Sequence, residues 1–187
     1  MLSYSELKRG IRIILEGDPY EIIESAPMFK ARGSSVLQTK IKNLKTGNVI
    51  SRTFRSADSF EEPDISKTEA KFLYSHREKY VFCEKDDPAK RFELGAEQLG
   101  YQKNFLKSSQ IVTALVFENE VINISLPIKI NLEVKQAPPS VKGERAQSGT
   151  KVATLETGAK INVPPFVESG DVIEVNTETG EYSRRIE

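Results

Sequence analysis

The sequence predicts an all-β protein that is divided into three small barrels. Almost every segment alternates a short run of β-branched and apolar residues with a turn that contains Gly, Pro, Asn or Asp. Apolar residues make up 38% of the 187-residue chain and charged residues 29%, a balance that suits several thin barrels better than one deep core. Helix-like stretches are confined to two short segments, 96–99 and 103–107.

The first barrel is expected over residues 1–63. Its predicted strands share a mixed apolar and β-branched composition and lie at 11–15, 20–24, 36–41 and 49–54. Turns are predicted at 16–19 and 45–48, and a loop is predicted over 25–35, which holds Pro27, Gly33, Ser34 and Ser35. The charged, Pro-containing segment 61–64 has no hydrophobic periodicity and indicates the first domain boundary.

The second barrel is expected over residues 64–127. Its predicted strands are the apolar runs 71–76, 79–84, 92–94, 111–117 and 121–125. Both helix-like segments fall before the last pair of strands, an order that favours a barrel of the oligonucleotide-binding (OB) type. Pro127 marks the boundary to the third unit.

The third barrel is expected over residues 128–187. Residues 128–134 alternate cleanly, which is typical of a strand with one buried face. Further strands are predicted at 151–155, 160–163, 171–175 and 182–186, after a long loop over 135–149. The dipeptides Thr46-Gly47, Thr157-Gly158 and Thr179-Gly180 recur in this chain, and we interpret them as turns and not as an internal repeat.

The candidate functional segment is the loop 25–35. The chain has 27 basic and 27 acidic residues, yet no Asp or Glu occurs from Ser25 to Ala57. The cations of this stretch are Lys30, Arg32, Lys40, Lys42, Lys45, Arg52 and Arg55. A cationic hairpin in a neutral protein indicates an anionic partner, for which RNA phosphate is the leading candidate. The alternative is a solvated loop whose charge has no specific role.

The residues for the common catalytic sites are scarce. Cys83 is the only cysteine, so no internal disulfide can form, and it lies in an alternating run where a buried structural thiol is expected. His76 is also the only histidine, so no thiolate–imidazole metal site of the usual kind is expected. We therefore predict no catalytic residue, metal or cofactor. No apolar run reaches membrane-spanning length and the N-terminus lacks a signal-peptide core, so a cytoplasmic protein without membrane contact is expected.

Several motifs resemble the bacterial elongation factor P family. The run Lys151-Val-Ala-Thr-Leu-Glu-Thr-Gly158, followed by Val163-Pro-Pro-Phe166 and Gly170-Asp171, closely resembles the C-terminal signature of that family. Further matches are Thr39-Lys-Ile-Lys-Asn-Leu44, Phe92-Glu-Leu-Gly-Ala-Glu-Gln-Leu99 and Thr179-Gly-Glu-Tyr182. The likeness covers the whole chain in the right order.

This resemblance implies a non-enzymatic translation factor. The family looks like three β-barrels in an L shape, an SH3-like or KOW-type barrel followed by two OB-fold barrels. Its members bind the 70S ribosome between the P and E sites, beside the P-site peptidyl-tRNA and rRNA, and relieve stalling at consecutive prolines. A monomer is expected.

The resemblance also implies functional residues. The tip of the first-domain loop carries a post-translationally modified residue, which maps onto Arg32. This chain resembles the subgroup in which a dedicated arginine rhamnosyltransferase modifies that residue, and an unmodified Arg32 is the alternative. The expected RNA-binding residues are Lys30, Arg32, Gly33, Lys40, Lys42, Arg145, Tyr182 and Arg185. Gly143-Glu144-Arg145 stands where the family commonly has Gly-Asp-Thr.

Three other functions stay open on the sequence. An elongation-factor-P-like paralogue would bind the same ribosomal site but act at different stalling motifs. A generic RNA-binding module would bind free RNA with a steep salt dependence. An enzyme that acts on RNA has the least support, because only one His and one Cys are present.

Overall fold

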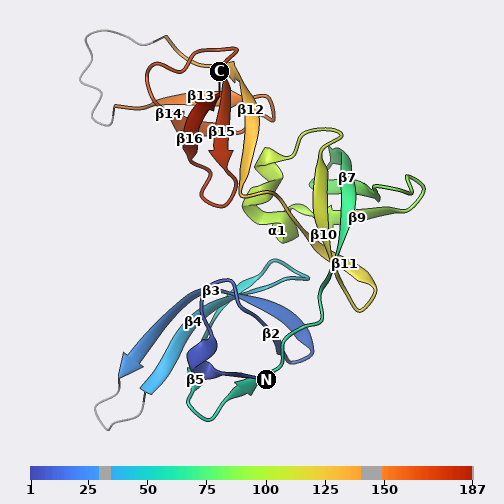
Figure 1. Ribbon diagram of the computed structural model, residues 1–187, viewed down its shortest axis with the longest axis vertical. Coiled ribbons are helices and arrows are strands. Elements are labelled where there is room, and N and C mark those ends of the chain that lie inside the picture. The colour runs from blue at the N-terminus through green and yellow to red at the C-terminus, as the bar shows by residue number, and fades with distance from the viewer. Residues whose placement is uncertain (30–34, 140–148, 187) are drawn as a thin grey trace.

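The computed structural model describes residues 1–29, 35–139 and 149–186. Its elements are almost entirely β-strands, which confirms the predicted fold class. Figure 1 shows three sheet-based units in a bent arrangement, with the central unit at the corner and the first and third units extending from it. The predicted elements recur with ends shifted by at most three residues, except that β3 runs into the candidate loop and β7 begins five residues earlier than predicted. The short elements at 2–6 and 59–60 were not predicted.

The first unit is a four-stranded antiparallel meander with a small two-stranded sheet. Its order is β2-β3-β4-β5, and β1 pairs with β6 beside it. The elements are β1 (Leu2–Ser3), the 3-10 helix η1 (Tyr4–Glu6), β2 (Arg12–Leu15), β3 (Asp18–Phe29), β4 (Ser35–Asn43), β5 (Val49–Arg55) and β6 (Ser59–Phe60). Its core consists of buried apolar side chains: Leu7, Ile13, Ile22, Leu37, Ile41, Phe54 and Phe60.

The predicted loop 25–35 is largely wrong, because β3 continues through it. Ser25 pairs with Thr39, and the ladder runs on until Phe29 pairs with Ser35. Pro27 lies within this ladder, opposite Leu37. A proline is tolerated there because backbone bonding on the outer edge of β3 ends at Ile22 among the described residues, so that edge needs no donor from Pro27. The hairpin is therefore longer and its described part more regular than the sequence predicted.

The second and third units share one topology. The second has β7 (Ser66–His76), β8 (Lys79–Glu84), β9 (Arg91–Gly95), α1 (Ala96–Leu99), the 3-10 helix η2 (Gly100–Phe105), β10 (Ile111–Phe117) and β11 (Glu120–Ser125). The third has β12 (Lys129–Gln136), β13 (Lys151–Leu155), β14 (Lys160–Val163), β15 (Val172–Asn176) and β16 (Tyr182–Ile186). In each unit the first strand lies centrally, between the second and the fourth, in the orders β11-β10-β7-β8-β9 and β14-β13-β12-β15-β16.

Local chemistry explains the tight connections in the second unit. The β7–β8 turn holds Arg77 and Glu78 at φ of 48° and 63°, and the β10–β11 turn holds Glu118 and Asn119 at 50° and 65°. Two successive positive φ values match the right-handed twist of the flanking strands. Cys83 is buried in β8, as the sequence predicted. The cores of the second and third units form one continuous apolar cluster.

Candidate nucleic-acid interface

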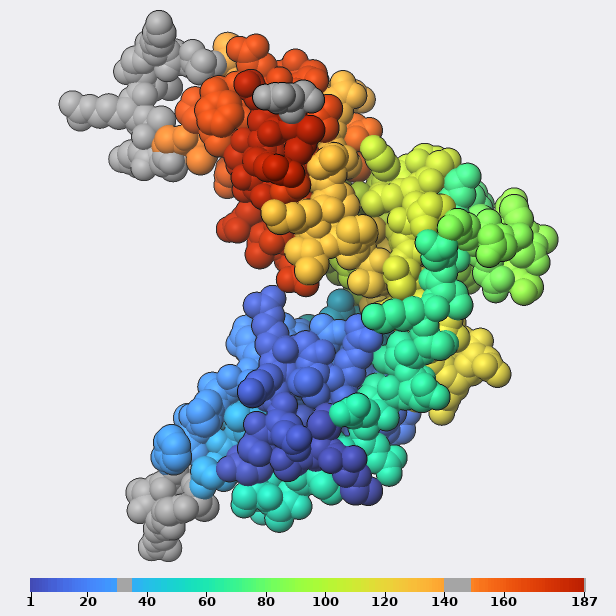
Figure 2. Space-filling view, in the orientation of Figure 1, coloured from blue at the N-terminus to red at the C-terminus, as the bar shows by residue number. Residues whose placement is uncertain are grey.

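The β3–β4 hairpin extends the first unit away from the rest of the molecule. From Ile22, just beyond the pairing with β2, seven residue steps lead to Phe29, a length of about 23 Å. Figure 2 shows this pair of strands at the far end of the first unit from the other two units. Lys30, Arg32 and Gly33 lie outside the described residues, so their roles stay predictions.

Two apolar side chains near the hairpin end were missed by the sequence reasoning. The side chain of Phe29 is 86% exposed and that of Met28 is 46% exposed. An exposed aromatic ring offers a face on which nucleic-acid bases stack, without regard to base identity. The available signal was an adjacent Met-Phe pair in a segment of otherwise small and polar residues. The assignment of this segment to a loop concealed it.

The cationic stretch of the first unit is partly neutralised by acids from preceding elements. Lys40 Nζ lies 2.9 Å from Glu24 Oε2 on the paired strand β3. Lys45 and Arg52 form ion pairs with Asp18 and Glu16, at 3.0 and 3.4 Å. All three acids precede Ser25 in the sequence, so the acid-free run 25–57 is not an acid-free surface.

Lys42 faces a cleft between the units. It shares one face of β4 with Lys40 because the two are two residues apart, but it lies farther from the hairpin end. The cleft has a volume of about 680 Å³ and is lined by residues of all three units, including Arg9, Lys42, Tyr101 and Thr177. Burial lowers the pKa of the Lys42 ammonium, and the carboxylate of Glu21 opposes this shift.

The third unit presents Arg185 against an exposed aromatic ring. The Arg185 guanidinium lies 5.7 Å from the ring centroid of Phe166, which is 57% exposed, and 3.5 Å from the Asp171 carboxylate. This cation–π contact and ion pair orient the guanidinium. Tyr182, three residues earlier on β16, is half-buried and packs against the apolar core. Arg145 lies outside the described residues.

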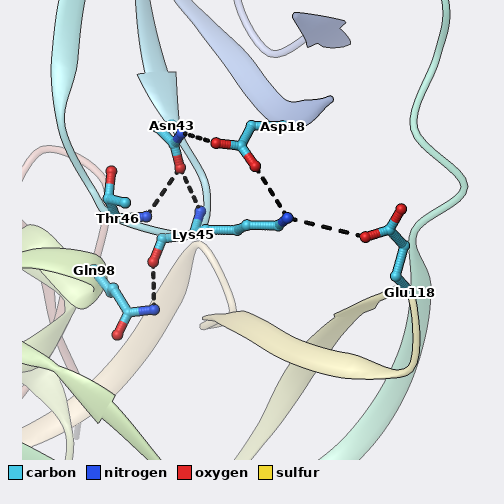
Figure 3. A network of polar contacts seen from close by, with 6 residues as sticks. All are labelled: Asp18, Asn43, Lys45, Thr46, Gln98 and Glu118. Atoms are coloured by element: carbon cyan, nitrogen blue, oxygen red, sulfur yellow. Dashed lines mark hydrogen bonds and ion pairs between the residues drawn. The ribbon is translucent and has the colours of Figure 1, made fainter. Parts of the chain in front are cut away.

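A polar network holds the first unit on the central one (Figure 3). Lys45 Nζ lies 3.0 Å from Asp18 and 4.0 Å from Glu118, and the side-chain amide of Gln98 donates to the Lys45 carbonyl at 2.5 Å. The hydrogen bond between Lys45 and Asp18 raises the pKa of Lys45 and lowers that of Asp18. Asn43 completes the network by donating to Asp18 at 3.1 Å. The hairpin is thereby anchored at its base on a second unit.

These features define a class of protein: a chain of small β-barrel units with an extended hairpin and cationic side chains exposed at separate ends. Comparison with family models specifies the class as a translation factor. Residues 3–60 match the elongation factor P KOW-like domain, residues 65–124 the elongation factor P OB domain and residues 130–185 the elongation factor P C-terminal domain. The chain belongs to the elongation factor P family.

Similarity to individual proteins extends over the full length. The chain is 39% identical over 186 residues to elongation factor P of Desulfotalea psychrophila, with 100% of this chain and 99% of that protein covered. It is 41% identical to the protein of that name from Syntrophus aciditrophicus, with the same coverage. The elongation factor P of Thermotoga petrophila is 40% identical, with 99% of this chain and 100% of that protein covered. Within the described residues, no helix has the length and apolar character needed to cross a membrane.

Proposed function

We propose that this protein is a monomeric translation elongation factor that binds the 70S ribosome between the P and E sites, beside peptidyl-tRNA. It promotes peptide-bond formation at consecutive prolines and so relieves stalling. The observation that carries this proposal is the full-length membership of the elongation factor P family, which extends over all three units. We assign the domains to residues 1–63, 64–127 and 128–187.

The hairpin is the part of the proposed factor that reaches the reacting end of the tRNA. Its ladder extends about 23 Å from the body, and exposed Met28 and Phe29 lead toward Arg32. A charged guanidinium at this position contacts the phosphates of the CCA end or stacks on its bases. Phe29 gives the same region a second, uncharged stacking surface.

The proposed mechanism is positioning, with the ribosome supplying the chemistry. Proline is a secondary amine in a locked ring, and a Pro-Pro peptidyl end sits poorly for attack. A factor that holds the CCA end in a reactive pose lowers the entropic part of the barrier. A thousandfold gain in rate corresponds to about 4 kcal/mol, which is within the range that orientation supplies. The protein itself needs no catalytic residue for this role.

Other expected RNA contacts follow the surface cations. Lys40 would exchange its partner Glu24 for a phosphate, which is a modest change because both side chains are more than half exposed. Lys30, Gly33 and Lys42 would contact rRNA or tRNA along the hairpin. The third unit would use Arg145, Tyr182 and Arg185 on the anticodon side of the same tRNA, with Arg185 already oriented by Phe166 and Asp171.

Arg32 is the proposed modification site, and a rhamnosyltransferase is the proposed modifying partner. A sugar on the guanidinium lengthens the reach of the side chain and adds hydroxyl donors and acceptors. Intact-mass and peptide mass spectrometry of protein from its native source tests this assignment. An increment of one deoxyhexose on the peptide that holds Arg32 is expected, and an unmodified peptide would contradict the assignment.

The function is tested by translating a Pro-Pro-Pro reporter in vitro. Wild-type protein should restore full-length product, Arg32→Ala should lose most of this activity, and Lys8→Ala serves as a control that removes an exposed charge of the same unit elsewhere. Equal rescue by wild type and Arg32→Ala would remove the role of Arg32. Failure of modified wild-type protein would contradict the function. Binding to free RNA without need of P-site tRNA would favour the generic module.

A further inference from the structure

Two five-residue turns in different units have the same construction. One connects β4 to β5 (Asn43–Gly47) and the other connects β15 to β16 (Asn176–Gly180). In each, the Asn side-chain oxygen accepts from the backbone amides two and three residues later, at 2.8 and 2.9 Å in the first turn and 2.9 and 3.2 Å in the second. The Gly amide then donates to the Asn carbonyl, at 2.9 and 2.8 Å. The two glycines have φ of +83° and +72°.

Both turns closely contact one segment of the central unit, α1–η2. A Cβ atom on Gly47 would lie 2.6 Å from the carbonyl carbon of Glu97 and 3.0 Å from Cα of Gln98, both backbone atoms. A Cβ atom on Gly180 would lie 2.7 Å from Cζ of Tyr101. The Tyr101 ring in turn packs edge-on against Phe105, which is fully buried. Each contact is thus possible only because the turn ends in a residue without a side chain.

The third Thr-Gly turn of the chain shows that this close approach is not a general property of such turns. Gly158 has φ of +86°, so its backbone demand is the same. Among the residues that the structure describes, no atom lies within 4 Å of the position where its Cβ would be. Its amide donates to Leu155, three residues earlier, and no Asn begins the turn. Gly158 therefore shares the φ requirement of Gly47 and Gly180 without sharing their contacts.

We propose that the two Asn-x-x-Thr-Gly turns, called docks below, hold the first and third units against one segment of the central unit, α1–η2, and that Gly47 and Gly180 are positioning residues. They set the separation between the hairpin of the first unit and the surface of the third (Figure 1). This inference deepens the proposed function: a factor that contacts two ends of one tRNA at once gains from a preset span, because the second contact then forms without further ordering.

The second residue of each turn strengthens its dock. Leu44 is buried in a cluster with Leu115, Phe117 and Ile122 of the central unit. Thr177 is also buried, and its hydroxyl donates to the carbonyl of Pro127, where the central unit ends, at 2.8 Å. At this second position the two turns therefore differ in chemistry, with an apolar side chain in the first and a hydroxyl in the second, while the turn backbone is the same.

The test compares Gly47→Ala and Gly180→Ala with Gly158→Ala in the full-length chain. Spin labels on Thr53→Cys, Ala89→Cys and Lys160→Cys report the distance from the central unit to each neighbour by pulsed dipolar spectroscopy, and buried Cys83 is not labelled. We expect Gly47→Ala to shift or broaden only the 53–89 distribution, and Gly180→Ala only the 89–160 distribution. Gly158→Ala should leave both unchanged, since it carries the φ strain alone.

A compensating change separates the dock from general damage to the third unit. Tyr101→Ala removes the ring that a Cβ on Gly180 would meet. Adding Gly180→Ala to that background should leave the 89–160 distribution unchanged, whereas damage within the third unit would persist. If Gly47→Ala does not fold, Leu44→Ala perturbs the same dock with the turn backbone intact. The proposal would be overturned if Gly47→Ala and Gly180→Ala gave the same distance distributions as Gly158→Ala.

The reporter assay links the docks to function. Where wild-type protein rescues the Pro-Pro-Pro reporter, Gly47→Ala should reduce the rescue at least tenfold and Gly158→Ala should not. Full rescue by a Gly47→Ala protein with altered distances would overturn the functional part of the inference. Failure of the wild-type protein would instead count against the proposed function, and the distance measurements would still decide whether the docks exist.

Discussion

Replacing Leu44 by Ala should weaken the junction between the first and central units by about 2–3 kcal/mol. Leu44 is only 3% exposed and packs on Leu115, Phe117 and Ile122. The change removes three carbon groups, worth about 2.4 kcal/mol at about 0.8 kcal/mol each, and the cavity left behind adds to this loss. We expect the lower part of the range for buried leucines because the cluster is small and close to solvent.

Calorimetry of the full-length protein measures this loss. A change of this size should lower the Tm by about 5–10 °C, since 1 kcal/mol corresponds to about 2–4 °C in a protein of this length. Val49→Ala is the matched control: Val49 follows the same turn, is 54% exposed and should change stability by less than about 0.5 kcal/mol. A Leu44→Ala shift no larger than that of Val49→Ala would refute the reasoning, because Leu44 would then not hold the junction.

Three further predictions concern charge and orientation. The pKa of Glu174 is lowered from 4.5, chiefly by its hydrogen bond from Lys129, so the carboxylate stabilises the fold above pH 4.5 and this benefit is lost as the pH falls through the lowered value. Glu174→Gln should therefore lower the Tm at pH 7, and the difference should shrink as the pH falls below 4.5 in a series of melts. Burial lowers the pKa of Lys42 from 10.5, so Lys42→Met should raise the Tm at pH 7. The gain in Tm of this variant over wild type should shrink as wild-type Lys42 loses its proton on approach to pH 10.5. A gain in Tm that does not depend on pH would point to packing alone. Phe166→Ala should increase the mobility of the Arg185 guanidinium, because the ring contact is lost and only the ion pair with Asp171 remains. The measurement is the heteronuclear NOE at Nε of Arg185, which should fall. An unchanged NOE would mean that Asp171 alone orients the guanidinium.

The sequence was a good guide to local structure because turn chemistry and two-residue periodicity are local properties. It predicted strands that end at residue 76 and restart at residue 79, and a buried Cys83, and both features are present. It failed at Ser25–Phe29, where a proline and small residues indicate a loop but the free edge of β3 tolerates them in a ladder. No local pattern could show that edge, because it depends on how short β2 is.

For the candidate site too, the sequence predicted some features and the folded structure decided others. The motifs sufficed to identify the family, since sequence similarity needs no coordinates, and Arg32 stays a prediction. The charge of the hairpin was overestimated, because Glu16, Asp18 and Glu24 precede the acid-free run and meet its cations only after β3 and β4 pair. Exposed Phe29 and the partnership of Phe166 with Arg185 also depend on which side chains the folded sheets leave uncovered.

What the sequence by itself determined is the set of strands and turns and the family of the protein, because these follow from residue types at short spacings. Only the tertiary structure decided which of those strands and turns contact another unit. An Asn begins two of the three Thr-Gly turns, but only the folded structure shows that Gly47 and Gly180 contact one helical segment, whereas no described atom lies within 4 Å of a Cβ position on Gly158. The physical reason is that a contact across tens of residues depends on the packing of whole sheets, which no short stretch of sequence encodes.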